Sequence, residues 1–188
     1  MPQFINKMEF NTKREFYINF DHEQDHSIEY LYSILNDTRT TTLLTVRNFS
    51  SVELDWQYKA GWNTIGALLL HISAIEHFFR IVYIENRELT VAENTELTPA
   101  LDMGVHIPSL ITGKEIDSYM HELSVSRQKL VESLKHVNFE DFNKTFESKD
   151  YGSTCNMAWI LFHMIEDEIY HRGQISMIKK LMAETKKA

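Results

Sequence analysis

The densest group of residues able to bind a metal or move a proton lies near the end of the chain, in the run HMIEDEIYHRGQIS, residues 163–176. On an α-helix, at about 100° per residue, His163, Asp167 and His171 would fall within a sector of roughly 80°. Gln174 would join the same stripe. Adjacent members are about 6 Å apart along the axis, so Asp167 can share one metal ion with either histidine. His163 and His171 are about 12 Å apart and cannot share an ion without distortion.

A third ligand must then come from a facing helix, and the best candidate is His71. It lies in the otherwise apolar run IGALLLHISAI, residues 65–75. Burying an unpaired imidazole among leucines and isoleucines costs about 1 to 3 kcal/mol, so this ring needs a partner. A hydrogen bond within the core would satisfy His71 as well as a metal would. Asp167 and His171 could equally form a simple pair on the helix surface.

The other candidate residues have simpler explanations. Glu166 and Glu168 point away from the stripe and are expected to be solvated, although Glu166 could orient a metal ligand. Cys155 lacks a partner for chemistry and is expected to be a packed small residue. Surface positions are expected for the histidines without a partner pattern, which are His22, His26, His77, His106, His121 and His136.

Length and composition limit the kind of fold that can hold these residues. The chain has 188 residues, of which 43% are apolar. A chain of this size can bury roughly 70% of its unfolded surface, which is enough for one globular domain. We expect a single domain over residues 1–188, with residues 1–20 as an N-terminal extension. The chain has only six glycines and three prolines, and this low number favours long helices over turn-rich folds.

Charge and cysteine content exclude several classes of protein. The 19 basic against 27 acidic residues give a formal charge of −8, and the basic residues are scattered, so nucleic-acid binding is not expected. A single cysteine rules out an internal disulfide framework and multi-cysteine metal sites, and it fits a reducing compartment. The chain shows no secretory signal and no run of about 18 apolar residues. We therefore expect a cytoplasmic protein without a membrane span.

Apolar residues spaced by three and four predict four amphipathic helices. We expect them over residues 21–48, 63–86 and 112–136, and from residue 153 or 154 almost to the C-terminus. The expected N-terminal caps are Asp21 with Gln24, Asn63, Thr112 with Glu115, and Ser153 or Thr154. Four such helices predict an all-α four-helix bundle, in which metal sites form from side chains on facing helices.

Two segments lack this helical pattern. Residues 87–111 contain Pro99, Gly104 and Pro108 without a sustained period, and are expected to form a long loop between the second and third helices. Long loops within a compact domain are often functional, so this one is expected to wall a pocket. The polar segment FEDFNKTFESKDYGS, residues 139–153, is expected to hold a brief hairpin.

The second and fourth predicted helices resemble a known family. The run WNTIGALLLHISAIEHFF, preceded by LDW, and the run HMIEDEIYHRGQI resemble the DinB-like superfamily of bacterial four-helix proteins. That superfamily includes the bacillithiol, mycothiol and glutathione S-transferase-like enzymes. The resemblance covers nearly the whole chain in order and spacing. Its most specific element is the His-Arg-Gly-Gln ending of the last run.

This resemblance implies a divalent metal, commonly nickel or zinc, with iron or manganese as alternatives, held by three histidines. Matched residue by residue, the three positions are His71, Asp167 and His171, so a carboxylate stands where the family has its middle histidine. Two histidines with one carboxylate still form a recurring catalytic triad of ligands. The substitution leaves metal preference and occupancy open. His163 matches a position just outside the coordination sphere, and the resemblance also implies a homodimer.

Two functions of different classes follow. The first is a metal-dependent enzyme that transfers a low-molecular-weight thiol to a small-molecule electrophile, or performs a related isomerisation or hydrolysis, with Gln174 or Arg172 orienting the substrate. The second is a non-catalytic, stress-associated protein whose metal or polar cluster is structural or lost. An open coordination position beside a pocket would favour the enzyme. A closed site, with His163 or Glu166 as a fourth ligand, would favour the structural role.

Overall fold

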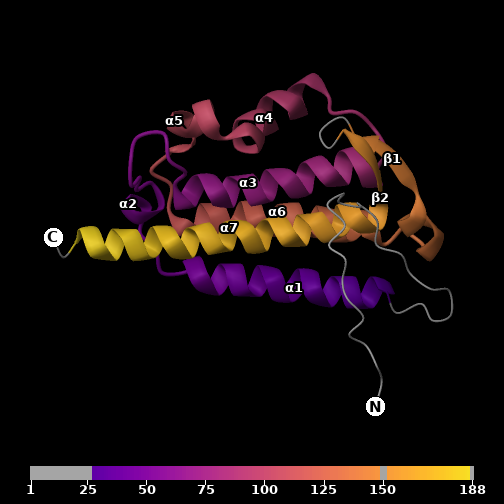
Figure 1. Ribbon diagram of the computed structural model, residues 1–188, viewed down its shortest axis with the longest axis horizontal. Coiled ribbons are helices and arrows are strands. Elements are labelled where there is room, and N and C mark those ends of the chain that lie inside the picture. Colours follow the sequence, from indigo (N-terminus) through magenta and orange to yellow (C-terminus); the bar gives the residue numbers. More distant parts are fainter. Residues whose placement is uncertain (1–26, 149–151, 187–188) are drawn as a thin grey trace, which may run out of the picture.

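Four long helices form the body of the protein in the computed structural model, which describes residues 27–148 and 152–186. They are α1 (Ser27–Val46), α3 (Ile65–Phe79), α6 (Ile116–Leu134) and α7 (Met157–Thr185). The helices lie side by side, and a β-hairpin covers the end opposite the C-terminus (Figure 1). α3 packs against α6 and α7, and α1 packs mainly against α7. The predicted helical class is confirmed for the described residues.

Shorter elements connect these helices. They are α2 (Ser51–Leu54), a π-helical turn (Arg80–Ile84), α4 (Val91–Asp102), a 3₁₀ turn (Gly104–His106), α5 (Ile107–Leu110), a second 3₁₀ turn (Phe139–Asn143), β1 (Thr145–Ser148) and β2 (Ser153–Asn156). The two strands pair antiparallel with Phe146 opposite Cys155, so the predicted hairpin is confirmed. Cys155 is buried, and burial raises the pKa of its thiol, as expected for a packed residue.

The central element is α3, as its apolar pattern predicts. Eleven of its 15 residues are buried, which no helix with a solvated face would show. By length and composition the segment Ile65–Ile84 could cross a membrane, but 67% of its apolar window is buried inside the protein, as in a core helix. The predicted cap at Asn63 is wrong by one residue. Thr64 caps the helix, its Oγ1 accepting a hydrogen bond from the amide of Ala67 at 3.0 Å.

The prediction of a long loop over residues 87–111 is wrong, because α4 and α5 lie within it. Thr90 and Glu93 form a capping box at the start of α4, and Arg87 holds Glu93 in place at 2.7 Å. Only Leu97 and Ala100 of α4 are buried, so the helix is too polar to show an apolar period. Pro99 lies inside α4, although proline usually marks a helix end.

The other predicted caps also differ from the structure. The capping box of Thr112 with Glu115 does not form, because the Thr112 hydroxyl instead bonds that of Tyr119 at 3.0 Å. Ser153 and Thr154 belong to β2. Asn156 caps α7 in their place and accepts a hydrogen bond from the amide of Trp159. The cap predicted at residues 21 and 24 lies outside the described residues.

Each of the four long helices contributes one charged side chain to a buried ionic network. Arg39 of α1 contacts Glu168 of α7 at 2.9 Å and Glu76 of α3 at 3.0 Å. Arg127 of α6 contacts Glu76 at 2.6 Å and Glu168 at 3.0 Å. All four side chains are at most 10% exposed, so the prediction that Glu168 is solvated is wrong. Burial alone would lower the pKa of Arg39, but the two carboxylates raise it.

Removing one carboxylate from this network is expected to destabilise the fold strongly. Glu168→Gln keeps the shape of the side chain but leaves two buried guanidinium groups with one carboxylate. We expect a loss of about 3 to 5 kcal/mol in the free energy of unfolding, measured by urea denaturation. The control Glu184→Gln, at an exposed position of the same helix, should change it by less than about 0.5 kcal/mol. Equal stabilities of the two variants would contradict the role of the network.

A glycine permits the close approach of α3 to α6. A Cβ atom added at Gly66 would lie 2.7 Å from the hydroxyl oxygen of Tyr119 and 2.9 Å from Cζ of the same ring. The Tyr119 side chain is 1% exposed and its hydroxyl is held by Thr112, so the ring has little room to move. Gly66 is therefore needed for packing between the two helices.

Gly66→Ala is expected to destabilise the protein by about 1 to 3 kcal/mol, because the new methyl group overpacks the core. The matched control is Gly173→Ala on α7, where an added Cβ meets nothing within 4 Å. Since alanine favours a helix, that substitution should stabilise the protein by about 0.5 to 1 kcal/mol. Thermal unfolding of both variants provides the measurement, and a stabilised Gly66→Ala protein would refute the packing argument.

Candidate metal centre

The structure brings His71, Asp167 and His171 together where α3 packs against α7. Each residue offers one ligand atom, and the three atoms lie within 4.8 Å of one another. Both histidines are buried, and the Asp167 side chain is 18% exposed. The juxtaposition expected from residue spacing is thus present. Asp167 and His171 share one face of α7 because four residues make about one helical turn.

A backbone carbonyl fixes the proton on His71. The Nδ1 atom of His71 lies 2.8 Å from the carbonyl oxygen of Ala100, which can only accept a hydrogen bond. Nδ1 therefore carries the proton, and in the neutral ring Nε2 carries a lone pair. Burial lowers the pKa of His71, more than the carbonyl of Ala100 and the carboxylate of Asp167 raise it. The ring is thus neutral near pH 7, the form that binds metals.

The lone pair on His71 faces a carboxylate. Nε2 lies 3.7 Å from Oδ2 of Asp167, and Oδ2 has no hydrogen-bond partner within the described part of the chain. On the other side of this carboxylate, Oδ1 lies 3.2 Å from Nε2 of His171. The Nδ1 atom of His171 is also buried without a hydrogen-bond partner among those residues. Asp167 and His171 therefore each carry one buried polar atom without a hydrogen bond, beside the ring of His71.

The donor set and the distances fit a divalent metal. Ligand atoms bonded at about 2.0 to 2.2 Å to one ion lie roughly 3 to 4 Å apart. The two histidines lie 3.7 and 3.2 Å from different oxygens of Asp167, and the three ligand atoms lie within 4.8 Å of one another, so a small inward shift would bring them to one ion. Two imidazoles with one carboxylate suit zinc, nickel, iron or manganese. The two histidine rings are in contact edge to face, with their centroids 4.7 Å apart.

The carbonyl of Ala100 is a functional group that sequence reasoning missed. Ala100 lies in α4, within the region predicted to be a loop. Hydrogen bonding of the second ring nitrogen is the usual way in which proteins orient a metal-binding histidine. Because every residue has a backbone carbonyl, no signal in the sequence could have identified this partner.

The remaining predicted site residues lie outside the cluster of three. The His163 ring stacks on Trp159 at a centroid distance of 4.8 Å, and its Nδ1 contacts Glu166 at 3.1 Å. Gln174 lines a separate cavity. Arg172 donates a hydrogen bond to a main-chain carbonyl of α1. None of these four residues is part of the metal-binding group found among the described residues.

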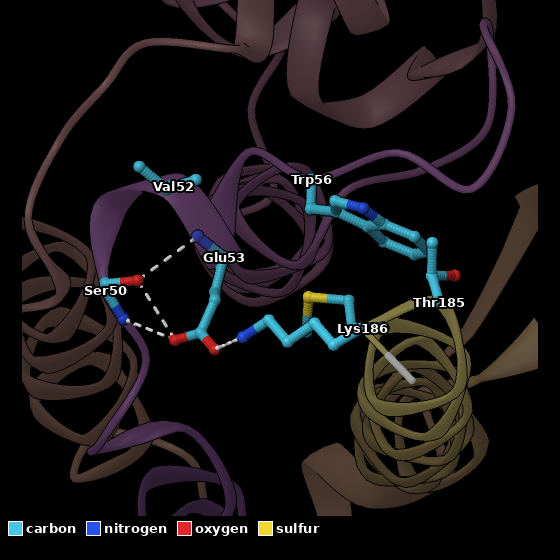
Figure 2. A pocket seen from close by; sticks show the side chains of 7 residues that line it. Ser50, Val52, Glu53, Trp56, Thr185 and Lys186 are labelled. Atoms are coloured by element: carbon cyan, nitrogen blue, oxygen red, sulfur yellow. Dashed lines mark hydrogen bonds and ion pairs between the residues drawn. The ribbon is translucent and has the colours of Figure 1, made fainter. Parts of the chain in front are cut away.

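A small cavity at the C-terminal end of α7 is not part of this centre. It has a volume of about 260 Å³ and lies between α2 and α7. Glu53 and Lys186 meet across it at 2.9 Å, and Figure 2 shows this pair beside Trp56. The contact with Lys186 and hydrogen bonds from Ser50 lower the pKa of Glu53 to about 2. This pair links the two helices and carries no group that suggests a reaction.

Two single variants, His71→Ala and His163→Ala, test whether the three residues bind metal. We expect untagged protein loaded with zinc or nickel, then dialysed, to hold about one equivalent of metal. His71→Ala should hold less than about a tenth of an equivalent, and His163→Ala should equal the unmodified protein. Elemental analysis gives the metal content, and circular dichroism confirms folding. An unmodified protein that holds no metal after loading would rule out the site.

Comparison with known proteins places the chain in a family. The family model described as DinB superfamily matches residues 34–175, which is most of the chain. The matched region runs from within α1 into α7 and includes His71, Asp167 and His171. A search of curated proteins finds no match. Because the family match covers well over half of the sequence and the fold is helical, the chain belongs to the DinB superfamily.

Proposed function

We propose that this protein binds a divalent metal through His71, Asp167 and His171 and uses it to transfer a low-molecular-weight thiol to an electrophile. The observation that carries the proposal is that two buried atoms, each with a free lone pair, face each other. These are Nε2 of His71 and Oδ2 of Asp167, 3.7 Å apart. The proposal includes a four-helix bundle as the scaffold, which four long helices packed side by side support.

A cation between these atoms would resolve their repulsion. A second proton on His71 is disfavoured, because burial lowers the pKa of the ring more than the carbonyl of Ala100 and the carboxylate of Asp167 raise it. A divalent ion would satisfy both atoms at once, together with His171. Nickel and zinc are the metals that the family resemblance implies. The carboxylate at the middle position also suits iron or manganese.

When bound, a divalent metal supplies Lewis-acid chemistry and lowers the pKa of a thiol or water that coordinates it. A divalent ion held by two imidazoles and one carboxylate would keep a net charge of about +1, which would stabilise a thiolate. In the transfer, the thiol proton passes to solvent, the sulfur bonds the electrophilic carbon, and that carbon loses its leaving group. Asp167 is the most exposed of the three side chains, so a substrate would approach from its side.

The proposal extends to location and partners. A single cysteine supports a reducing, cytoplasmic location, and the charge of −8 supports a small-molecule substrate over nucleic acid. The burial of α3 inside the protein supports the absence of a membrane partner. We also propose a homodimer, on the family resemblance.

The low solvent exposure of the three side chains favours a second candidate function. In it the protein is non-catalytic, and its metal or polar cluster is structural. The side chains of His71, Asp167 and His171 are 10%, 18% and 7% exposed. Such a cluster could tie α3 to α7 without admitting a substrate. Closed sites of this kind contribute directly to folding energy.

Turnover with metal-loaded protein separates these candidates. We expect conjugation of 1-chloro-2,4-dinitrobenzene with at least one thiol from a panel of glutathione, cysteine, bacillithiol and mycothiol, measured by product absorbance. His71→Ala should lower the rate by about 100-fold or more, because the transition state loses its metal. The structural role would instead give bound metal, a melting temperature raised by that metal, and a rate equal to that of the His71→Ala protein.

A further inference from the structure

A second candidate site lies at the hairpin end of the molecule. It is a shallow cavity of about 680 Å³, widely open to solvent, between the end of α3 with its π-helical turn, the start of α4, and β1. This volume is within the range of small-molecule sites, roughly 300 to 1,000 Å³. The cavity contains none of the three residues of the proposed metal centre. It therefore needs an explanation of its own.

Three of the residues that line the cavity are aromatic. Phe78, Tyr83 and Phe146 line it, one from α3, one from the π-helical turn and one from β1. The rings of Tyr83 and Phe146 meet edge to face at 5.4 Å, and those of Phe78 and Tyr83 at 6.3 Å. Packing of the rings against one another holds their orientation without a ligand. Aromatic rings attract cations to their faces.

The charged groups at the cavity favour a cation as well. Arg87 lines it, but Glu93 holds its guanidinium at 2.7 and 2.8 Å and Glu85 at 3.1 Å, so that positive charge is already balanced. Glu88 and Glu147 also line the cavity, and both residues are exposed. One carboxylate oxygen of Glu147 accepts a hydrogen bond from the hydroxyl of Thr154 at 2.9 Å, which leaves its negative charge uncompensated. Arg80 also contacts Glu85, so two guanidinium groups and four carboxylates at this end carry a net charge of −2. An anionic ligand would be repelled, and a cationic one attracted.

We propose that this cavity binds a small organic cation, an ammonium group with aryl or alkyl substituents. The substituents would contact the aromatic wall, and the charge would lie between the ring faces and the carboxylates of Glu88 and Glu147. Binding of this kind requires no metal. It is therefore independent of the function proposed above.

The position of the cavity relates it to the metal centre. Phe78 follows His71 by seven residues on α3, which places it about 10 Å along the helix and within about 20° of the same face. On α4, Asn94 lines the cavity and Ala100 contacts His71. Both sites thus lie along the same two helices.

Calorimetric titration of the full-length, metal-free protein tests the cation site. The probes are benzyltrimethylammonium and phenylacetate, which share a benzyl group and differ in charge. We expect the cation to bind at least about tenfold more tightly than the anion. Equal affinities, or no binding of the cation, would overturn the inference. Because no metal is present, that failure would leave the proposed metal centre untouched.

Two sets of variants locate the binding. Glu88→Gln combined with Glu147→Gln should weaken binding of the cation about tenfold, and Glu96→Gln, an exposed position of α4 outside the cavity, should not change it. Phe146→Leu keeps an apolar side chain but removes the ring, and should weaken binding about fivefold. Phe162→Leu is its control on α7. Full affinity in the double variant would place the cation elsewhere and refute the proposal.

Discussion

The buried network of Arg39, Glu76, Arg127 and Glu168 is the constraint on which the rest of the structure depends. Each arginine contacts both carboxylates, so no long helix can slide or rotate without leaving a charge unpaired in the core. Apolar packing alone tolerates small shifts of this kind more readily. The network therefore fixes the register of the four helices relative to one another.

That register also determines the geometry of the metal centre. Glu76 lies five residues after His71 on α3, and Glu168 directly follows Asp167 on α7. The same two arginines bridge both glutamates, so α3 and α7 are held at one relative height. At that height His71 lies opposite Asp167 and His171. Consecutive residues of α7 thus serve different purposes, because a step of about 100° turns Glu168 to the arginines and Asp167 to His71.

Those features of the metal centre that depend on the residue pattern of a single segment could be predicted from the sequence. The spacing of His163, Asp167 and His171 was sufficient to place them on one face of a helix, and the apolar run around His71 was sufficient to make α3 central. The partners of Glu168 could not be predicted, since Arg39 and Arg127 lie on other helices and their pairing depends on tertiary packing. The same reason applies to α4, whose few buried residues show no period but pack on α3.

The contact between α4 and α3 shows why that missed helix matters for chemistry. Ala67 and Ala74 of α3 lie in one apolar cluster with Leu97 and Ala100 of α4. Alanine side chains on both helices permit a close approach of the two backbones, and this brings the carbonyl of Ala100 to 2.8 Å from His71. The carbonyl then decides which nitrogen of the ring faces Asp167. A larger side chain at either alanine of α3 would push α4 away and release the ring, so the form of His71 that can bind a metal depends on packing between two helices.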